Sequence, residues 1–380
     1  MRYMKLCLIL LLCLSLCGCS LLAQGSHVNV RPHAPEAFGN VGQTLSVANY
    51  GQLYEAVVQM VHAGTTQQLL AVEKYDKNQL SRDLIRLRDD LCRKDPVSAY
   101  ALDRVEGTLG TVNGLAALSV QIQYLRDPSL LRQIVRVQDR AGAEKTIGQA
   151  LAQCESGVLL YIKDFSGMDF TQIVEMYSTE HPELVMEQPQ VMVSVYPETG
   201  ESRLVELKFS YQISRDTLKT MQSQVTPVFR SAALYVSGDA APEQKYAQLF
   251  SFLMERYDYT YATSTTPAYS LLRQGVGDSR AFAMIYGAMC RQAGLECYMV
   301  AGNHAGENCY WNIICIDGIY YHVDLLANQE NGAFSVCDDT MMQQNGYLWD
   351  MPHHRICGVL PYRDGIVGMQ ENIFLENLKN

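Results

Sequence analysis

The residue types best suited to nucleophilic chemistry lie in the last third of the chain: Cys309, His304, Asp324 and Ser279. A thiol or hydroxyl becomes a strong nucleophile when an imidazole takes its proton and a carboxylate orients that imidazole. His304 precedes Cys309 by five residues, in a segment expected to be a loop, where a solvated side chain is the simpler interpretation. Cys309 lies on an expected strand, outside the field of a helix N-terminus that lowers a thiol pKa. Ser279 has no base placed for it and is expected to cap a helix.

The hydrophobic pattern around these residues predicts a helix, a second helix, a strand and a hairpin. The first helix covers 243–257, with apolar side chains at helical spacing. The second carries a buried stripe and ends near Gly294. A strand is expected over 297–301, and a hairpin over 311–316 and 319–323, because Asp-Gly at its centre favours a tight turn. The buried stripe of the second helix consists of Ala281, Met284, Ile285, Ala288 and Met289.

The segment 243–357 resembles the bacterial transglutaminase-like family of the papain-like fold. That family has Gly-Val-Cys at a helix start followed by Gly or Ser, an aromatic residue and Ala, then Leu-Gly-Ile, a His-Ala-Trp-Asn strand and a Gly-x-Trp-Tyr-His-Val-Asp strand. The counterparts here occur in the same order: Gly275-Val276-Gly277 with Ser279 and Ala281, Ala293-Gly294-Leu295, Cys309-Tyr310-Trp311-Asn312, and Gly318 to Asp324. Phe334 to Met341 resembles the family's next loop.

Two departures from the family pattern bear on catalysis. The position of the catalytic cysteine is Gly277, the position of the histidine is Cys309, and only the orienting acid, Asp324, is retained. An acid alone supplies neither nucleophile nor base, so the resemblance implies a catalytically inactive domain. It also implies a groove, whose walls are expected to include Trp311, Asn312 and His322. For Trp311 and His322, packing in the core is an equally sufficient role.

The segment before this domain is predicted to contain an internal repeat. Leu69 to Tyr75 resembles Leu159 to Phe165, and Leu118 to Tyr124 resembles Val205 to Tyr211, at offsets of about 86 to 90 residues. A helix expected from Asn49 therefore precedes two strand-helix-strand-strand-helix units, roughly 65–150 and 155–238.

The first 18 residues are typical of a bacterial lipoprotein signal peptide. Arg2 and Lys5 precede an apolar run that is too short to span a bilayer. Leu16-Cys17-Gly18-Cys19 resembles a lipobox, which implies that Cys19 carries a lipid. Residues 19–45 are rich in Gly, Pro, Ser and Asn and are predicted to be a tether.

Composition limits the partners and cofactors. The formal net charge is −10, and more negative by two without Arg2 and Lys5, which excludes a nucleic-acid partner. Eight cysteines follow Cys19, but no CxxC or Cys/His ligand spacing occurs, so neither a metal nor a cofactor is expected. The eight cysteines could form disulfides in an exported protein, or could be buried free thiols that act as small apolar residues.

The sequence thus predicts an α+β protein: a signal peptide (1–18), a tether (19–45), a helix plus two α/β repeats (46–240) and a degenerate transglutaminase-like domain (241–380). The expected function is a surface lipoprotein on the extracytoplasmic face of the membrane that holds an envelope polypeptide or glycan without catalysis. The alternatives are an active cysteine peptidase or crosslinking enzyme with relocated residues, and a purely structural envelope protein. A thiol or hydroxyl within about 3.5 Å of a histidine oriented by Asp324 would favour the enzyme. A surface without an aromatic-lined hollow would favour the structural protein.

Overall fold

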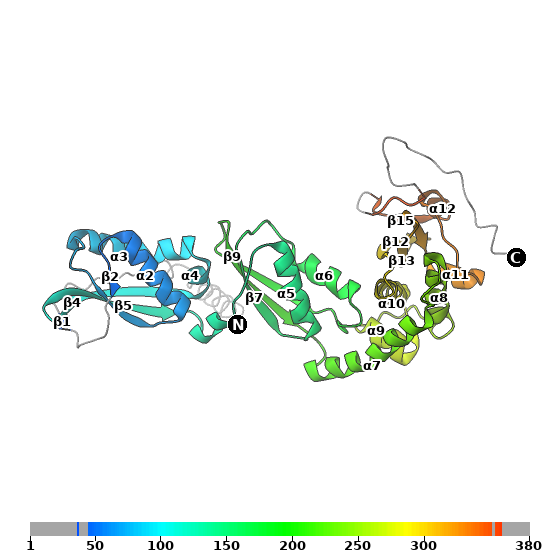
Figure 1. Ribbon diagram of the computed structural model, residues 1–380, viewed down its shortest axis with the longest axis horizontal. Coiled ribbons are helices and arrows are strands. Elements are labelled where there is room, and N and C mark those ends of the chain that lie inside the picture. The colour runs from blue at the N-terminus through cyan, green and yellow to red at the C-terminus, as the bar shows by residue number, and fades with distance from the viewer. Residues whose placement is uncertain (1–35, 38–44, 352–353, 359–380) are drawn as a thin grey trace, which may run out of the picture. The chain divides into compact units, whose positions relative to one another are not determined.

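The computed structural model describes residues 36–37, 45–351 and 354–358 (Figure 1). The chain divides into two compact units: 1–136 with 159–164 and 195–205, and 137–158 with 165–194 and 206–380. The signal peptide (1–18) and Cys19 lie outside the described residues. Glu36–Ala37 form strand β1 and Leu45–Ser46 form β2, so the expectation of a structureless tether over 19–45 is wrong at these positions.

The first sheet has the strand order β1-β4-β5-β3-β2, with β3 at Gln67–Ala71, β4 at Leu102–Val112 and β5 at Leu115–Tyr124. Helices α2 (Tyr50–Ala63), α3 (Lys77–Lys94) and α4 (Pro96–Ala101) accompany it. Their first turns are capped by Asn49, Asp76 and Asp95, whose side chains accept backbone N–H groups. A helix does start at Asn49, as the sequence predicts.

The second sheet has the order β6-β7-β9-β8, from β6 (Val135–Val137), β7 (Gly157–Ile162), β8 (Gln190–Tyr196) and β9 (Arg203–Ser210). Helices α5 (Arg140–Ala152), α6 (Phe170–Glu180) and α7 (Arg215–Tyr235) follow β6, β7 and β9. Ser214 and Asp127-Pro128 are both good helix starts in the sequence, and each follows the last strand of a repeat. Ser214 does cap α7. After Asp127 the chain forms only the short 3₁₀ segment η1 (Pro128–Gln133), because it enters β6 within a few residues.

The third sheet, with the order β14-β13-β12-β15, belongs to the C-terminal region. Strands β12 (Cys297–His304), β13 (Glu307–Ile316), β14 (Ile319–Val323) and β15 (Tyr347–Trp349) pair antiparallel. The predicted hairpin is confirmed, since Asp317 and Gly318 join β13 to β14 with φ of 52° and 83°, as a type I′ turn requires.

Helix α10 (Ser279–Gln292) is the central element of this region. All ten residues from Ala281 to Cys290 are buried, and Gly294 follows the helix with a φ of 74°, as the sequence predicts. Helix α8 (Pro242–Met254) packs against it, and α11 (Leu325–Asn331) and α12 (Asp339–Gln344) follow β14. Between α8 and α10 lie β10 (Asp258–Tyr259), α9 (Pro267–Tyr269), the π-helical turn η2 (Ser270–Gln274) and β11 (Val276–Gly277). No helix among the described residues is long and apolar enough to cross a membrane.

The tight packing at Gly302 in β12 gives a prediction on stability. A Cβ atom there would lie 2.4 Å from both the Leu348 carbonyl oxygen and the ring of Trp311. We expect Gly302→Ala to lower the free energy of unfolding of this domain by about 1–3 kcal/mol, the usual cost of overpacking. Both tryptophans of the chain lie in this sheet, so unfolding followed by tryptophan fluorescence reports on this domain.

The matched control is Gly167→Ala, because an added Cβ at that exposed position meets no atom within 4 Å. Equal unfolding midpoints for the two variants would contradict the packing described for β12.

Candidate functional site

Gly277 ends β11 and stands directly before the helix that would carry a nucleophile. Its backbone pairs in parallel with Tyr259 of β10. A Cβ built on Gly277 would lie 3.0 Å from the Cβ of Ala281 and 3.1 to 3.2 Å from the side chain of Leu271. Its φ is not positive, so space rather than backbone conformation favours glycine here. The side chains of Leu271 and Ala281 thus leave little room for a side chain at this position.

The first turn of α10 offers no substitute nucleophile. Asp278 is the N-cap, and its carboxylate accepts the backbone N–H of Ala281 at 2.9 Å. The capping role expected for Ser279 is therefore taken by Asp278. Ser279 is the first residue of α10, and its hydroxyl hydrogen-bonds to no histidine in the part of the chain that the structure describes.

Cys309 lies on β13 opposite Gly302 and is half-buried. Burial and the nearby negative charge of Asp324 raise the pKa of its thiol to about 11. A charge on Cys309 contributes to the raised pKa of the Tyr259 phenol, and Tyr259 is the strand partner of Gly277. Burial and the charge of Asp324 thus disfavour the Cys309 thiolate that catalysis would need.

Asp324 has a new set of partners. Its Oδ1 accepts the backbone N–H groups of Leu326 and Ala327, at 2.9 and 3.1 Å, and so caps α11. Its Oδ2 accepts the phenol of Tyr347 at 2.7 Å. The hydrogen bonds of the retained acid go to a helix start and a tyrosine, and none goes to an imidazole in the described chain.

His304 is held away from the acid. It is the last residue of β12, opposite Glu307, so the expectation of a loop is wrong: the two residues Ala305 and Gly306 close a tight hairpin with positive φ. The exposed imidazole stacks on the ring of Tyr347, with centroids 4.1 Å apart and planes 5° apart. Its Nε2 lies 3.2 Å from the carbonyl oxygen of Asn345, which is the only hydrogen-bond partner the described residues give it.

The residues expected to form groove walls are core residues. Trp311, Asn312 and His322 are all 0% exposed, so that expectation is wrong. Asn312 donates to the carbonyl oxygen of Ala283 in α10 at 2.9 Å, which ties β13 to the helix. At such close approach of helix and sheet, these side chains fill the interface and reach no surface.

A second His–Asp pair lies in this core. The indole N–H of Trp311 donates to Nδ1 of His322 at 2.9 Å, so the neutral imidazole carries its proton on Nε2, which donates to Asp339 at 2.8 Å. Cys357 is also close, with its backbone N–H donating to Asp339 at 3.2 Å. Burial and the carboxylate of Asp339 raise the pKa of the Cys357 thiol, so it is not a ready nucleophile.

His322, Asp339 and Cys357 have ligand atoms within 4.8 Å of one another, which is the geometry of a metal cluster. A cation at Nε2 would displace the proton that Asp339 accepts, and Nδ1 is occupied by the indole donor of Trp311. The three side chains fit a hydrogen-bond network that holds α12 and residues 354–358 on the sheet better than a metal site.

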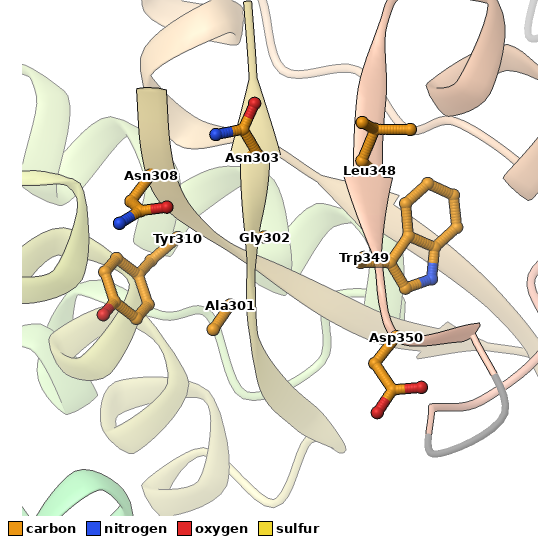
Figure 2. Close-up of a pocket in the computed structure, with 8 residues that line it drawn as sticks. All are labelled: Ala301, Gly302, Asn303, Asn308, Tyr310, Leu348, Trp349 and Asp350. Carbon is orange, nitrogen blue, oxygen red and sulfur yellow. The ribbon is translucent and has the colours of Figure 1, made fainter. Parts of the chain in front are cut away.

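An open hollow of about 460 Å³ is lined in part by Asn308 and Tyr310 (Figure 2). These are the chain neighbours of Cys309, so their side chains lie on the face of β13 opposite to that of the thiol. Asn303 of β12 and Leu348 and Asp350 of the β15 segment add side chains to the same surface. The hollow carries amides, a phenol and a carboxylate but no imidazole, which suits hydrogen bonding to a ligand better than proton transfer.

Sequence reasoning missed Tyr347 and Asp339, which bind the retained Asp324 and His322. Asp339 lies in the segment Phe334 to Met341 that resembles a family loop, but no role was assigned to it, and Tyr347 lies outside the matching motifs. The approach of both depends on the way residues 338–350 return to the sheet. The only signal was indirect: Asp338-Asp339 is a good helix start, which places an acid at the beginning of α12.

Residues 230–334 match the family model of the transglutaminase-like superfamily. The solved structures that resemble this chain include a TGase (8% identity, 44% of this chain and 50% of that chain, TM-score 0.25). A second is a putative protease from Parabacteroides distasonis, with 10% identity over 58% of this chain and 35% of that chain and a TM-score of 0.22. A third is a putative cysteine protease from Cytophaga hutchinsonii, with 14% identity over 39% of this chain and 66% of that chain and a TM-score of 0.24. The chain thus spans between about a third and two thirds of these structures. No protein of curated function matches the sequence.

The environment of Cys309 gives a prediction on its titration. The rate of alkylation by iodoacetamide, followed by mass spectrometry of the peptide that contains Cys309, should rise with pH toward a pKa of about 11. Asp324→Asn removes a negative charge that opposes the thiolate, so the pKa of Cys309 should fall. Asparagine is also a good N-cap, so α11 should persist.

Asp317→Asn serves as the control, since this exposed turn residue is not among the groups that shift the pKa of Cys309. A wild-type Cys309 with a pKa below the ordinary thiol value of about 8.5 would contradict the geometry and favour an active enzyme.

Proposed function

Residues 230–334 form a transglutaminase-like domain, and from this premise we propose that the protein is a lipid-anchored envelope protein whose domain binds a ligand without catalysis. The observation that carries the proposal is the partner set of Asp324. Its carboxylate, which would orient a catalytic imidazole, caps α11 and binds Tyr347.

The other two triad positions support the same conclusion. Gly277 has no nucleophilic side chain and little space for one. Where the family has an imidazole, Cys309 has a thiol, and the pKa of that thiol is raised. Acyl transfer through a cysteine needs a thiolate and a base in contact. His304 would have to leave both Tyr347 and Asn345 to act as that base.

We propose that the hollow lined by Asn308 and Tyr310, on the face of β13 opposite to Cys309, contributes to binding. Asn303, Asn308 and Tyr310 project from adjacent strands and offer amide and hydroxyl groups, which suit the backbone of an extended envelope polypeptide or the hydroxyls of a glycan (Figure 2). The competing proposal is an active cysteine peptidase or crosslinking enzyme with relocated residues, which would require a thiol or hydroxyl in contact with a histidine oriented by Asp324.

The proposal for the remaining chain is a membrane anchor and a spacer. The lipobox-like Leu16-Cys17-Gly18-Cys19 supports a lipid on Cys19 and a location on the extracytoplasmic face of the membrane. A duplication of two α/β units is supported by strand order, since β4-β5-β3-β2 and β8-β9-β7-β6 match when strands are paired in chain order. The matching sets begin at β2 and β6, so the bounds expected from the sequence, 65–150 and 155–238, are wrong: β6 belongs to the second sheet, and α5 follows it. Such units would hold the C-terminal domain away from the membrane.

The loss of catalysis is tested with two assays: incorporation of a fluorescent primary amine into a glutamine-bearing protein, and hydrolysis of a fluorogenic peptide. We expect the wild-type chain to show no more activity than Cys309→Ala or Asp324→Asn, because no thiolate and base are in contact. Activity in the wild type that disappears in Cys309→Ala would establish the competing enzyme.

The anchor is tested by Cys19→Ala. This variant should be released from the membrane fraction or accumulate unprocessed, because the residue that would receive the acyl chains is gone. Cys17→Ala is the matched control and should fractionate as the wild type does. A Cys19→Ala protein that is processed normally and stays with the membrane would rule out the lipid anchor.

A further inference from the structure

A second pocket, of about 400 Å³, shares no lining residue with the hollow lined by Asn308 and Tyr310. Four segments that are distant in the sequence form it within the second compact unit: residues 178 and 185–188, Gln212, residues 263–267, and Arg280 with Met284 on α10. Its size lies in the range of small-molecule sites, which is roughly 300–1,000 Å³.

The pocket contains a cation that has no carboxylate partner among the described residues. Arg280 is half-buried, and its Nη2 donates to the side-chain oxygen of Gln188 at 3.1 Å. The acid nearest in the lining, Glu187, is buried and accepts the backbone N–H groups of Gln212 and Ile213 at 2.7 and 3.0 Å. Since a guanidinium has five donors, most of those of Arg280 are available to a ligand.

The remaining lining has two chemical characters. Thr263, Ser264 and Thr265 place three hydroxyl-bearing residues in succession at the rim. Val185 and Met284, in contrast, are buried and form an apolar floor together with Met186. A ligand that fits has an anionic group for Arg280, polar atoms for the hydroxyls and a small apolar part.

We propose that this pocket binds the C-terminal carboxylate of a peptide with small apolar last residues. A planar carboxylate matches the fork of a guanidinium, which binds it through two parallel hydrogen bonds. The rim hydroxyls suit the last peptide group, and the apolar floor suits alkyl side chains. This inference rests on the proposed binding role, whereas the alkylation of Cys309 tests the loss of catalysis separately.

The pocket is a property of the whole second unit. The match to the transglutaminase-like superfamily begins at residue 230, whereas the Gln188 and Gln212 walls precede it. Residues 178–212 and the transglutaminase-like domain both contribute lining residues to the pocket, so a ligand bound in it would contact both. This assigns the second α/β unit a part in recognition as well as in spacing.

The experiment titrates the full chain, by calorimetry, with N-acetyl-alanyl-alanine and with its C-terminal amide. The acid should bind at least about tenfold more tightly than the amide, since charge-assisted hydrogen bonds are the strong ones. Arg280→Gln should abolish this difference, and Arg280→Lys should restore part of it. Arg273→Gln, at an exposed arginine seven residues earlier, is the matched control and should bind as the wild type does.

Equal affinities for acid and amide in the wild type would overturn the proposal, as would an Arg280→Gln variant that keeps the preference. No binding of the acid by a correctly folded wild-type chain would overturn it as well. Thermal unfolding of each variant separates loss of binding from loss of fold.

Discussion

The complete burial of α10 is the constraint on which the C-terminal domain depends. A helix with ten consecutive buried residues has no free face, so every neighbour must fit against it. Small residues make this possible: Ala283 and Gly287 let β13 approach until Asn312 reaches the helix backbone. On another face, the phenol of Tyr286 donates to the carbonyl oxygen of Tyr246 in α8. The N-terminus of α10 is fixed in space as a result.

This constraint explains how the domain could keep its fold without the catalytic residues, as the proposed function requires. The residues that hold α10 in place are apolar or small, and the triad positions at its edge contribute little to that packing. Cysteine and histidine can therefore be lost without loss of the core. The retained acid is different, because Asp324 caps α11 and binds Tyr347, so it is kept by its structural contacts whether or not catalysis continues.

The sequence was informative wherever local chemistry decides the structure. The Asp317-Gly318 turn, the stop at Gly294 and the stripe of α10 follow from backbone conformation and spacing, and all are present. The sequence left core and groove wall as alternatives for Trp311 and His322, because their burial depends on how residues 338–351 and 354–358 pack against the sheet. It also gave no sign of the pocket at Arg280, which needs segments about 90 residues apart in the chain.

The position of Arg280 links the proposed loss of catalysis to the proposed recognition of a carboxylate. In the family motif an aromatic residue stands three positions after the cysteine, and here that position holds an arginine whose donors face a pocket. A hydrogen bond from a guanidinium to one neutral amide is weak. A guanidinium in a hydroxyl-lined hollow with an apolar floor can instead form stronger, charge-assisted hydrogen bonds to a partly desolvated anion. The same helix turn that would hold a nucleophile in an enzyme thus presents a cation in this protein, and fixing that turn serves binding as well as it would serve catalysis.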